Sequence, residues 1–472
     1  MLFYTFEFQV LFVLTLVLYY KFPQRRVAVI GLANAIFYGV TGMPYLILFL
    51  AVAWTTYYAA KKMPSKHGAF FFGLGLGVNL LNLLFFKYSV FIAEAVLGIL
   101  RVQIDLSTTF LSTIVLPIGI SFYTFQLIAY LVDVKRGEVI PEKSFLVFWV
   151  FISFFGQLIA GPIMRANGFM PQIEKLSTYQ IRQENLQKGI FFIMSGLIKK
   201  LVIADNLAPM VIPYFNGTMP LTTISAWIGA YLFGFQIYFD FSAYSEIAVG
   251  IGAFFGLDLE INFKTPYLSG NPPEFWNRWH ITLSRWIRDY IYIPLGGNRR
   301  GFWKGCLFVL IAMSISGLWH GAAWTFLVWG VFHGIVSALN RIYVKYLSGF
   351  RERVKQKKWY RNVCVFGFFQ LVTIGWVFFR AASFQEAVHF IQLMLVPTNL
   401  FYHVSYVKSF LLIAVLYLSH VVEFLIHKNQ VNLSGTWNRT PEFIRAAVIV
   451  LVMITVIWSS PTEQSAFIYF QF

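Results

Sequence analysis

Charged residues and cysteines are both scarce in this chain, and each shortage excludes some classes of protein. Only 12% of its 472 residues are charged, and a mean hydropathy of +0.66 excludes an ordinary soluble domain of this length. The two cysteines, Cys306 and Cys364, lie in or beside apolar runs. The sequence therefore offers no disulfide framework, no cysteine-based metal cluster and no obvious thiol nucleophile.

Signatures of several soluble enzyme classes are missing as well. There is no GxSxG serine-hydrolase motif, no Walker loop, no HExxH zinc motif and no dinucleotide-binding glycine pattern. Acidic residues are sparse around His320, for which the nearest in sequence are Asp289 and Glu352. We therefore predict no metal and no permanently bound cofactor. The halves of the chain share no pair of interrupted helices, which weighs against an inverted-repeat transporter.

Apolar sequence is what the chain has in abundance. Hydrophobic residues make up 58% of it, and a membrane-spanning helix needs about 20 consecutive residues of this kind. We predict an all-α, polytopic integral membrane protein with roughly eleven to fourteen membrane-embedded helices and short interfacial helices. No polar stretch is long enough for a soluble domain, so residues 1–472 should form a single transmembrane domain. The apolar windows lie near residues 1–20, 27–62 (two), 69–100 (one or two), 108–132, 144–164, 189–204, 221–257 (two), 306–345 (two), 362–379, 404–427 and 442–459.

The net charge of +17 does not require nucleic acid as a partner. Much of the basic excess lies in short loops, such as residues 61–66 and 351–361. Loops of this kind follow the positive-inside rule for membrane proteins. Two acids, Asp240 and Glu246, lie within or beside an apolar run and are unusual there. We expect Asp240 to orient a neighbouring helix through hydrogen bonds, in a segment where Tyr238 and Ser242 offer partners.

His320 is the strongest candidate for chemistry. It lies in the middle of the apolar run 306–332, where hydrocarbon would ordinarily exclude an ionisable ring. Gly317 and Gly321 flank it, which weakens the helix locally and lets another backbone or a ligand approach closely. The alternative is a histidine hydrogen-bonded between helices. A neutral imidazole in an apolar tunnel would suit general base catalysis at a hydroxyl that attacks a thioester.

Two further histidines, His280 and His333, are candidates for the same site. His280 lies in the polar stretch 258–305, and His333 follows His320 by thirteen positions, so sharing a site would require a helix break near the glycines. For His333 we favour a structural hydrogen bond. The other histidines fall at helix ends or in loops, where a solvated side chain is expected; they are His67, His389, His403, His420 and His427.

The polar stretch 258–305 contains a patterned helix. Asn271 to Glu274 reads as a helix start, with an asparagine cap, prolines in the first turn and a glutamate that reaches back, and residues 294–297 stop the helix. Between these signals a continuous helix would separate two faces and suit the membrane interface. The polar face would hold Arg278, Thr282, Arg285 and Asp289, and the aromatic face Trp276, Trp279, Leu283, Trp286 and Tyr290, with His280 at its edge.

Several long motifs carry a family resemblance over nearly the whole chain. They occupy residues 117–122, 157–163, 238–245, 274–280, 288–298 and 317–321. On these motifs the chain resembles the membrane-bound O-acyltransferases, and within them the bacterial branch that acetylates polysaccharides such as alginate. The segments 238–245 and 276–280 are also similar to the enzymes that transfer D-alanine to teichoic acid. The resemblance implies helices around a central tunnel in the bacterial cytoplasmic membrane.

The resemblance also implies a reaction that crosses the membrane. A cytoplasmic thioester, plausibly acetyl-CoA, would give its acetyl group to an extracytoplasmic hydroxyl, often on a partner acetyltransferase of the SGNH type that finishes the transfer to polysaccharide. His320 matches the presumed base and His280 the second family histidine. Arginines would suit the donor phosphates, although ordinary positive-inside anchoring also accounts for them. The substrate-binding residues would be Trp276, Asn277, Arg278, Trp279, Arg285, Arg288, Asn298 and Trp319, with Arg299, Arg300 and Lys304 as further cations.

Two other functions stay open from the sequence. In one, the enzyme class is the same and the donor is a D-alanyl carrier protein. In the other, the protein is a transporter or flippase for a lipid-linked sugar, and its histidines relay protons. The lack of a convincing cysteine or serine nucleophile favours direct transfer over a covalent acyl-enzyme.

Overall fold

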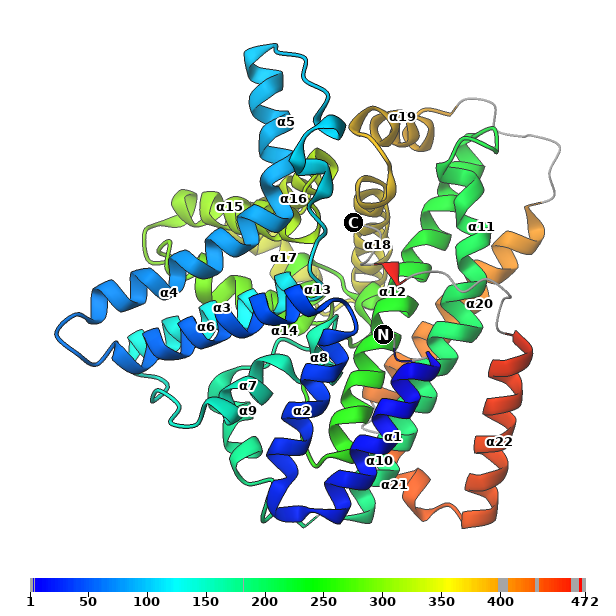
Figure 1. Cartoon of the computed structure of the whole chain (residues 1–472). Coiled ribbons are helices and arrows are strands. Elements are labelled where there is room, and N and C mark those ends of the chain that lie inside the picture. The colour runs from blue at the N-terminus through cyan, green and yellow to red at the C-terminus, as the bar shows by residue number, and fades with distance from the viewer. Residues whose placement is uncertain are drawn as a thin grey trace. The chain divides into compact units, whose positions relative to one another are not determined.

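A computed structural model describes residues 3, 5–180, 182–397, 406–428, 433–459 and 467–468. Within these ranges every regular element is a helix, which confirms the predicted all-α class (Figure 1). His403 and the side chain of His427 lie outside the described residues. The chain divides into two compact units, Met1–Ile193 with Ile247–Glu260, and Met194–Glu246 with Ile261–Phe472. The predicted single domain stays a prediction.

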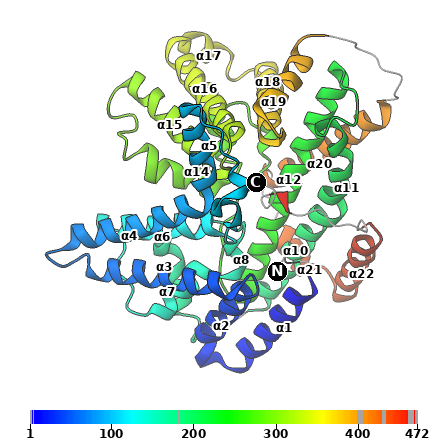
Figure 2. The same cartoon turned by 45° about the horizontal axis from the view of Figure 1, so that its top comes forward.

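The first unit begins with two helices that meet in a sharp bend of 120° at Pro23 (Figure 2). Arg26 lies inside this bend, where its guanidinium donates to the carbonyl of Leu176 at 2.9 Å and covers the ring of Tyr19 at 4.8 Å. A buried arginine is thereby satisfied by carbonyls and an aromatic face. The helices of this unit are α1 (Phe6–Lys21), α2 (Arg26–Gly39), α3 (Met43–Lys62), α4 (Gly68–Leu83), α5 (Ser89–Leu100), α6 (Ile120–Arg136), α7 (Phe145–Ser153), α8 (Phe155–Leu158) and α9 (Ala166–Glu174).

Two helices, α10 (Gln183–Leu197) and α12 (Thr223–Phe254), pass from one unit to the other. The window 221–257, predicted as two helices, is this single α12 of 32 residues. Two helices were predicted because the apolar stretch is longer than one membrane span. The stretch forms one helix instead, because no proline interrupts it. Its glycines serve packing instead, since a Cβ on Gly229 would lie 2.7 Å from the Tyr214 side chain.

The second unit carries the remaining helices and a buried charged cluster. Asp240 on α12 pairs with Lys200 at 2.8 Å and accepts from the backbone N–H of Ile468 at 2.8 Å. The expected partners Tyr238 and Ser242 bond elsewhere. Tyr238 donates to Glu423, and Ser242 donates to the backbone oxygen of Phe239. The helices are α11 (Asp205–Phe215), α13 (Pro272–Trp276), α14 (Ile281–Ile287), α15 (Phe302–His320), α16 (Trp324–Tyr346), α17 (Ser348–Val354), α18 (Lys358–Arg380), α19 (Phe384–Leu395), α20 (Val407–Lys428), α21 (Leu433–Arg439) and α22 (Glu442–Ser459).

The number of complete spans is smaller than the number of predicted embedded helices. Among the described residues, 7 helices are long and apolar enough to cross a membrane, or up to 8 when the bent pair counts as one span. Several other apolar windows form helices shorter than a span, such as α6 with 17 residues, α7 with 9 and α10 with 15. The chain is a polytopic membrane protein, and the figure of eleven to fourteen embedded helices exceeds its complete spans.

Candidate active site

Helices α15 and α16 lie side by side (Figures 1 and 2), and His320 is the last residue of α15, at the turn between them. A Cβ on Gly317 would lie 2.2 Å from the backbone oxygen of Phe326, and one on Gly330 would lie 2.3 Å from that of Met313. Only glycine permits this approach of two backbones. Helix α15 ends at His320, and the chain continues in extended conformation through Gly321 (φ −157°). The expected approach of another backbone is confirmed at Gly317, whereas a Cβ on Gly321 would meet the side chain of Phe326.

His280 is placed by a break that the sequence did not reveal. It stands between α13 and α14 in the left-handed region, with φ 42°. Asn262, from the preceding loop, caps α14 because its side-chain oxygen accepts from the N–H of Thr282 at 3.1 Å and from its hydroxyl at 2.7 Å. The predicted continuous helix and its two faces were therefore wrong. The predicted start is correct, since Asn271 accepts from the N–H of Glu274, whose carboxylate reaches back one residue further, to the N–H of Gly270.

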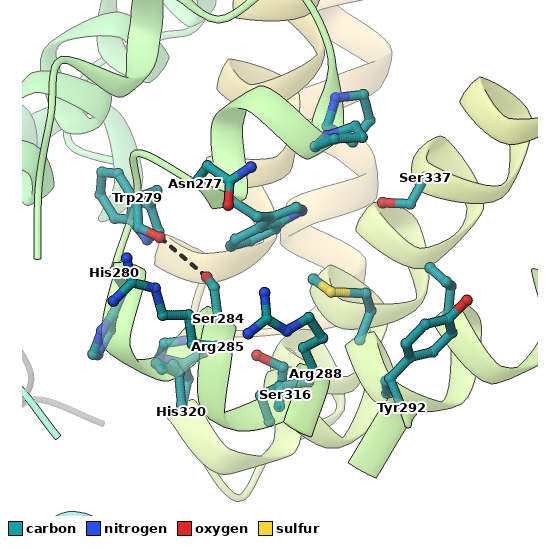
Figure 3. A pocket seen from close by; sticks show the side chains of 18 of the residues that line it. Asn277, Trp279, His280, Ser284, Arg285, Arg288, Tyr292, Ser316, His320 and Ser337 are labelled. Carbon is teal, nitrogen blue, oxygen red and sulfur yellow. Dashed lines mark hydrogen bonds between the residues drawn. The ribbon is translucent and has the colours of Figure 1, made fainter. Parts of the chain in front are cut away.

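A cavity of about 370 Å³ brings the two histidines together (Figure 3). Both rings line it, and both residues are buried, with 1% of His280 and 4% of His320 exposed. The lining follows one face of α15, since Val309, Met313, Ser316 and His320 recur at intervals of three or four and Ala312 lies three residues after Val309. Besides the histidines it consists of Pro272, Pro273, Trp276, Asn277, Trp279, Leu283, Ser284, Arg285, Ile287, Arg288, Tyr292, Val309, Ala312, Met313, Ser316, Ser337 and Arg341.

Most of the predicted substrate-binding residues line this cavity. Those that do are Trp276, Asn277, Trp279, Arg285 and Arg288, together with both predicted catalytic histidines.

Three predicted residues, Arg278, Trp319 and Asn298, lie outside the lining. Arg278 is turned away by the break at His280 and pairs with Glu274 at 2.7 Å. Trp319 is buried between the histidines, its ring centroid 5.9 Å from that of His280 and 4.9 Å from that of His320. Asn298 contacts a lining arginine, Arg341. Whether any of these residues binds substrate stays a prediction.

Tyr292, Ser316, Ser337 and Arg341 line the cavity and were missed from the sequence. For Ser316 a signal existed, because it precedes His320 by four residues and so shares its helix face. Ser337 and Arg341 are likewise four apart on α16, but Arg341 resembles an ordinary cationic anchor near the end of an apolar helix.

The cavity combines neutral imidazole with basic side chains. Burial lowers the pKa of His280, which lies outside the membrane-spanning helices, to about 3, so this ring is neutral at physiological pH. None of the described lining residues is acidic, whereas three are arginines. Among the residues that the structure describes, no group of three or more histidine, cysteine or acidic residues could hold a metal ion.

The other histidines divide into exposed and buried ones. His67 and His389 are exposed, as expected. His420 was expected to be solvated and is buried instead, with its Nε2 accepting from the backbone N–H of Tyr267 at 3.2 Å. His333 is also buried, but it does not line the cavity. Its ring lies 4.8 Å from Trp329, which in turn lies 5.0 Å from His320.

Comparison with known proteins defines the class. The sequence pattern of the membrane-bound O-acyltransferase family matches residues 140–384, a range that contains the whole lining of the cavity. A probable alginate O-acetylase AlgI of Pseudomonas putida is 35% identical over 96% of each chain. A peptidoglycan O-acetyltransferase of Helicobacter pylori is 32% identical over 91% of this chain and 79% of its own. A teichoic acid D-alanyltransferase of Streptococcus thermophilus is 27% identical over 60% of this chain and 73% of its own.

These matches establish that the chain belongs to the membrane-bound O-acyltransferase family. It is accordingly an O-acyltransferase, of the acetyltransferase kind, built as a multi-pass membrane protein.

Proposed function

We propose that the protein passes an acetyl group from a cytoplasmic thioester, acetyl-CoA, through the bacterial cytoplasmic membrane to a hydroxyl outside, for O-acetylation of a polysaccharide. The acceptor is the polysaccharide itself or an extracytoplasmic acetyltransferase of the SGNH type that completes the transfer. Two relatives support this assignment by their names, alginate O-acetylase and peptidoglycan O-acetyltransferase, since both act on carbohydrate polymers. The observation that carries it is the cavity shared by His320 and His280.

His320 acts as the general base in this proposal. The acceptor oxygen attacks the carbonyl carbon of the thioester while its proton passes to the imidazole of His320. The carbon–sulfur bond then breaks, and the departing thiolate takes the proton from the ring. One ester and one free thiol result, so that no oxidant, metal or covalent acyl-enzyme is required. Ser316, one turn before His320 in the same lining, offers a hydroxyl that can orient the thioester or the acceptor.

The neutral state of His280 favours a positioning role beside this base. A ring whose pKa lies near 3 accepts a proton poorly at physiological pH, but its nitrogens can still donate and accept hydrogen bonds. The aromatic walls around both histidines exclude water, which protects the thioester from hydrolysis. His280 is therefore assigned to orientation and His320 to proton transfer.

The test uses membrane vesicles that contain the full chain, radiolabelled acetyl-CoA and mannuronate oligosaccharides as acceptor. His320→Gln, which keeps much of the ring's volume, should insert normally and lose roughly 10²- to 10⁴-fold in transfer rate. His389→Gln removes an exposed histidine and is the matched control, with unchanged transfer. Undiminished transfer by His320→Gln would refute the role of His320. A lipid-linked sugar transporter, by contrast, would form no acetylated product in any vesicle.

A second cargo is supported by the teichoic acid D-alanyltransferase relatives. Their identity of 27% covers 60% of this chain or less, against 35% over 96% for the alginate O-acetylase. The comparison favours acetyl. Adding a D-alanyl carrier protein to the same vesicles separates the two, because a D-alanyl enzyme would label the acceptor from that donor and not from acetyl-CoA.

A further inference from the structure

The cavity has a second polar cluster, formed by Arg341, Tyr292 and Asn298. Arg341 of α16 donates from Nη1 to the hydroxyl of Tyr292 at 2.7 Å and from Nη2 to the side-chain oxygen of Asn298 at 2.6 Å. Tyr292 also donates to that oxygen, at 2.7 Å. Arg341 and Tyr292 line the cavity, and Asn298 holds the guanidinium from behind. Three hydrogen bonds thus fix the direction of one cation at the cavity wall.

The partners of Arg341 leave its charge uncompensated. Both are neutral, and among the described residues no carboxylate forms an ion pair with Arg341. Arg288, by contrast, is bound by Asp289 through two contacts, of 2.7 and 3.3 Å. A guanidinium has five N–H donors, so two bonds leave three for a ligand. An oriented arginine without a counter-ion, facing a cavity that no described acid lines, is arranged to receive an anion.

The guanidinium of Arg341 lies beside α15, and its place along that helix gives its distance from His320. A Cβ on Gly305 would lie 2.7 Å from Nη2 of Arg341, so the guanidinium packs beside Gly305. Fifteen residues separate Gly305 from His320 on the same helix, which is about 22 Å along its axis. In Figure 3, Tyr292 and Ser337 lie on the side of the cavity opposite to His280 and His320.

On the α15 wall the lining between these two ends is mostly apolar, whereas Arg285 and Arg288 lie between the same ends on another wall (Figure 3). Val309, Ala312 and Met313 follow one another on the cavity face of α15 before Ser316 and His320 are reached. A long, slender and uncharged chain fits such a passage better than a sugar, whose hydroxyls would lose their hydrogen bonds to water.

We propose that Arg341, oriented by Tyr292 and Asn298, binds the phosphate that ends the pantetheine arm of the thioester donor. This rests on the proposed function. From sulfur to phosphate the arm has about a dozen bonds of about 1.5 Å, so it spans roughly 16 Å when extended. The hydrogen bonds at its two ends, to the guanidinium and to the imidazole, add about 3 Å each. With the phosphate at the guanidinium, the thioester carbonyl therefore comes within reach of His320, about 22 Å away along α15. Coenzyme A and the prosthetic group of a carrier protein both carry this phosphate, and Arg341 recognises what they share.

The experiment measures equilibrium binding to the purified full chain in detergent. The probes are S-acetylpantetheine, S-acetyl-4′-phosphopantetheine and acetyl-CoA. For the wild type we expect the phosphate to improve affinity at least roughly tenfold over the unphosphorylated arm. Arg341→Gln should abolish this gain and leave the affinity for S-acetylpantetheine unchanged. Asn298→Asp keeps the guanidinium and sets a carboxylate against it, so it should remove most of the gain as well.

Lys345→Gln is the matched control. It removes one positive charge one turn further along α16, where the ammonium lies 4.1 Å from the ring centroid of Phe302 and does not line the cavity. It should keep the full gain from the phosphate. Tighter binding of acetyl-CoA than of S-acetyl-4′-phosphopantetheine supports the inference with free coenzyme A as the source, and equal binding supports it with a carrier protein.

Three outcomes would overturn the inference. If Arg341→Gln keeps the gain from the phosphate, the anion binds elsewhere. If this variant weakens S-acetylpantetheine as much as the phosphorylated arm, Arg341 only supports the cavity wall, and the proposed function survives. If the wild type binds none of the three probes while folded, the pantetheine thioester is not the donor, and the proposed function fails together with the inference.

Discussion

Two regions of the second unit hold clusters of polar groups, and they differ in how those groups are paired. In one cluster, Lys200 of the π-helical segment Ile198–Ala204 lies between Asp205 of α11 and Asp240 of α12, each at 2.8 Å, and all three side chains are at most 5% exposed. Lys199 beside it contacts Glu246. At the cavity, the histidines meet aromatic rings and Arg341 meets neutral partners.

This difference separates a structural site from a functional one. Buried charges that neutralise each other join helices and have little left to offer a ligand. A buried base and a cation with unused hydrogen-bond donors destabilise the protein unless a substrate bonds to them. The presence of a charged residue in an apolar region is therefore weak evidence of function. Whether that charge is paired with an opposite charge is stronger evidence.

Removal of Lys200 should give the largest loss of stability. Lys200→Met leaves Asp205 and Asp240 facing each other without a cation, and breaking a buried ion pair costs about 3–5 kcal/mol. The measurement is the unfolding free energy of the purified protein in detergent. Lys188→Met breaks the exposed pair with Asp258, which contributes about 0–1 kcal/mol, and is the control. Equal losses in the two variants would contradict the structural role given to the cluster.

A substitution at Gly317 tests whether the close approach of α15 and α16 determines the geometry of the cavity. Gly317→Ala would press a methyl group onto the backbone oxygen of Phe326, at 2.2 Å, and overpacking of this kind costs about 1–3 kcal/mol. Because the helices must separate near His320, acetyl transfer should fall as well. Gly367→Ala on α18 meets nothing within 4 Å and should gain up to about 1 kcal/mol of helix propensity. A stable, fully active Gly317→Ala variant would show that the close approach does not position the base.

The sequence predicted the helices and the chemistry better than the shape of the site. Hydropathy locates the α15–α16 pair because two apolar windows are separated by a glycine-bounded histidine. The break at His280 was missed because Asn262, which caps α14 in place of a local residue, stands 20 positions before Thr282. Arg341 was missed because its role depends on Tyr292 and Asn298, which are 49 and 43 residues away. Local patterns cannot encode such long-range contacts.

Burial of the neutral His280 ring at the cavity predicts that the stability of the protein depends on pH. The pKa of His280 falls from 6.5 in the unfolded chain to about 3 in the folded protein, so between these values only the unfolded chain binds the proton. Stability should therefore fall as the pH drops below 6.5, by about 1.4 kcal/mol per unit, and be unaffected by this group above it. Between pH 7.5 and 5.5 the wild type should lose about 1.4 kcal/mol more than His280→Gln, which has no ring to protonate. His389→Gln, at an exposed position, should keep the wild-type dependence, and an identical pH response of all three proteins would mean that His280 is not buried as a neutral ring.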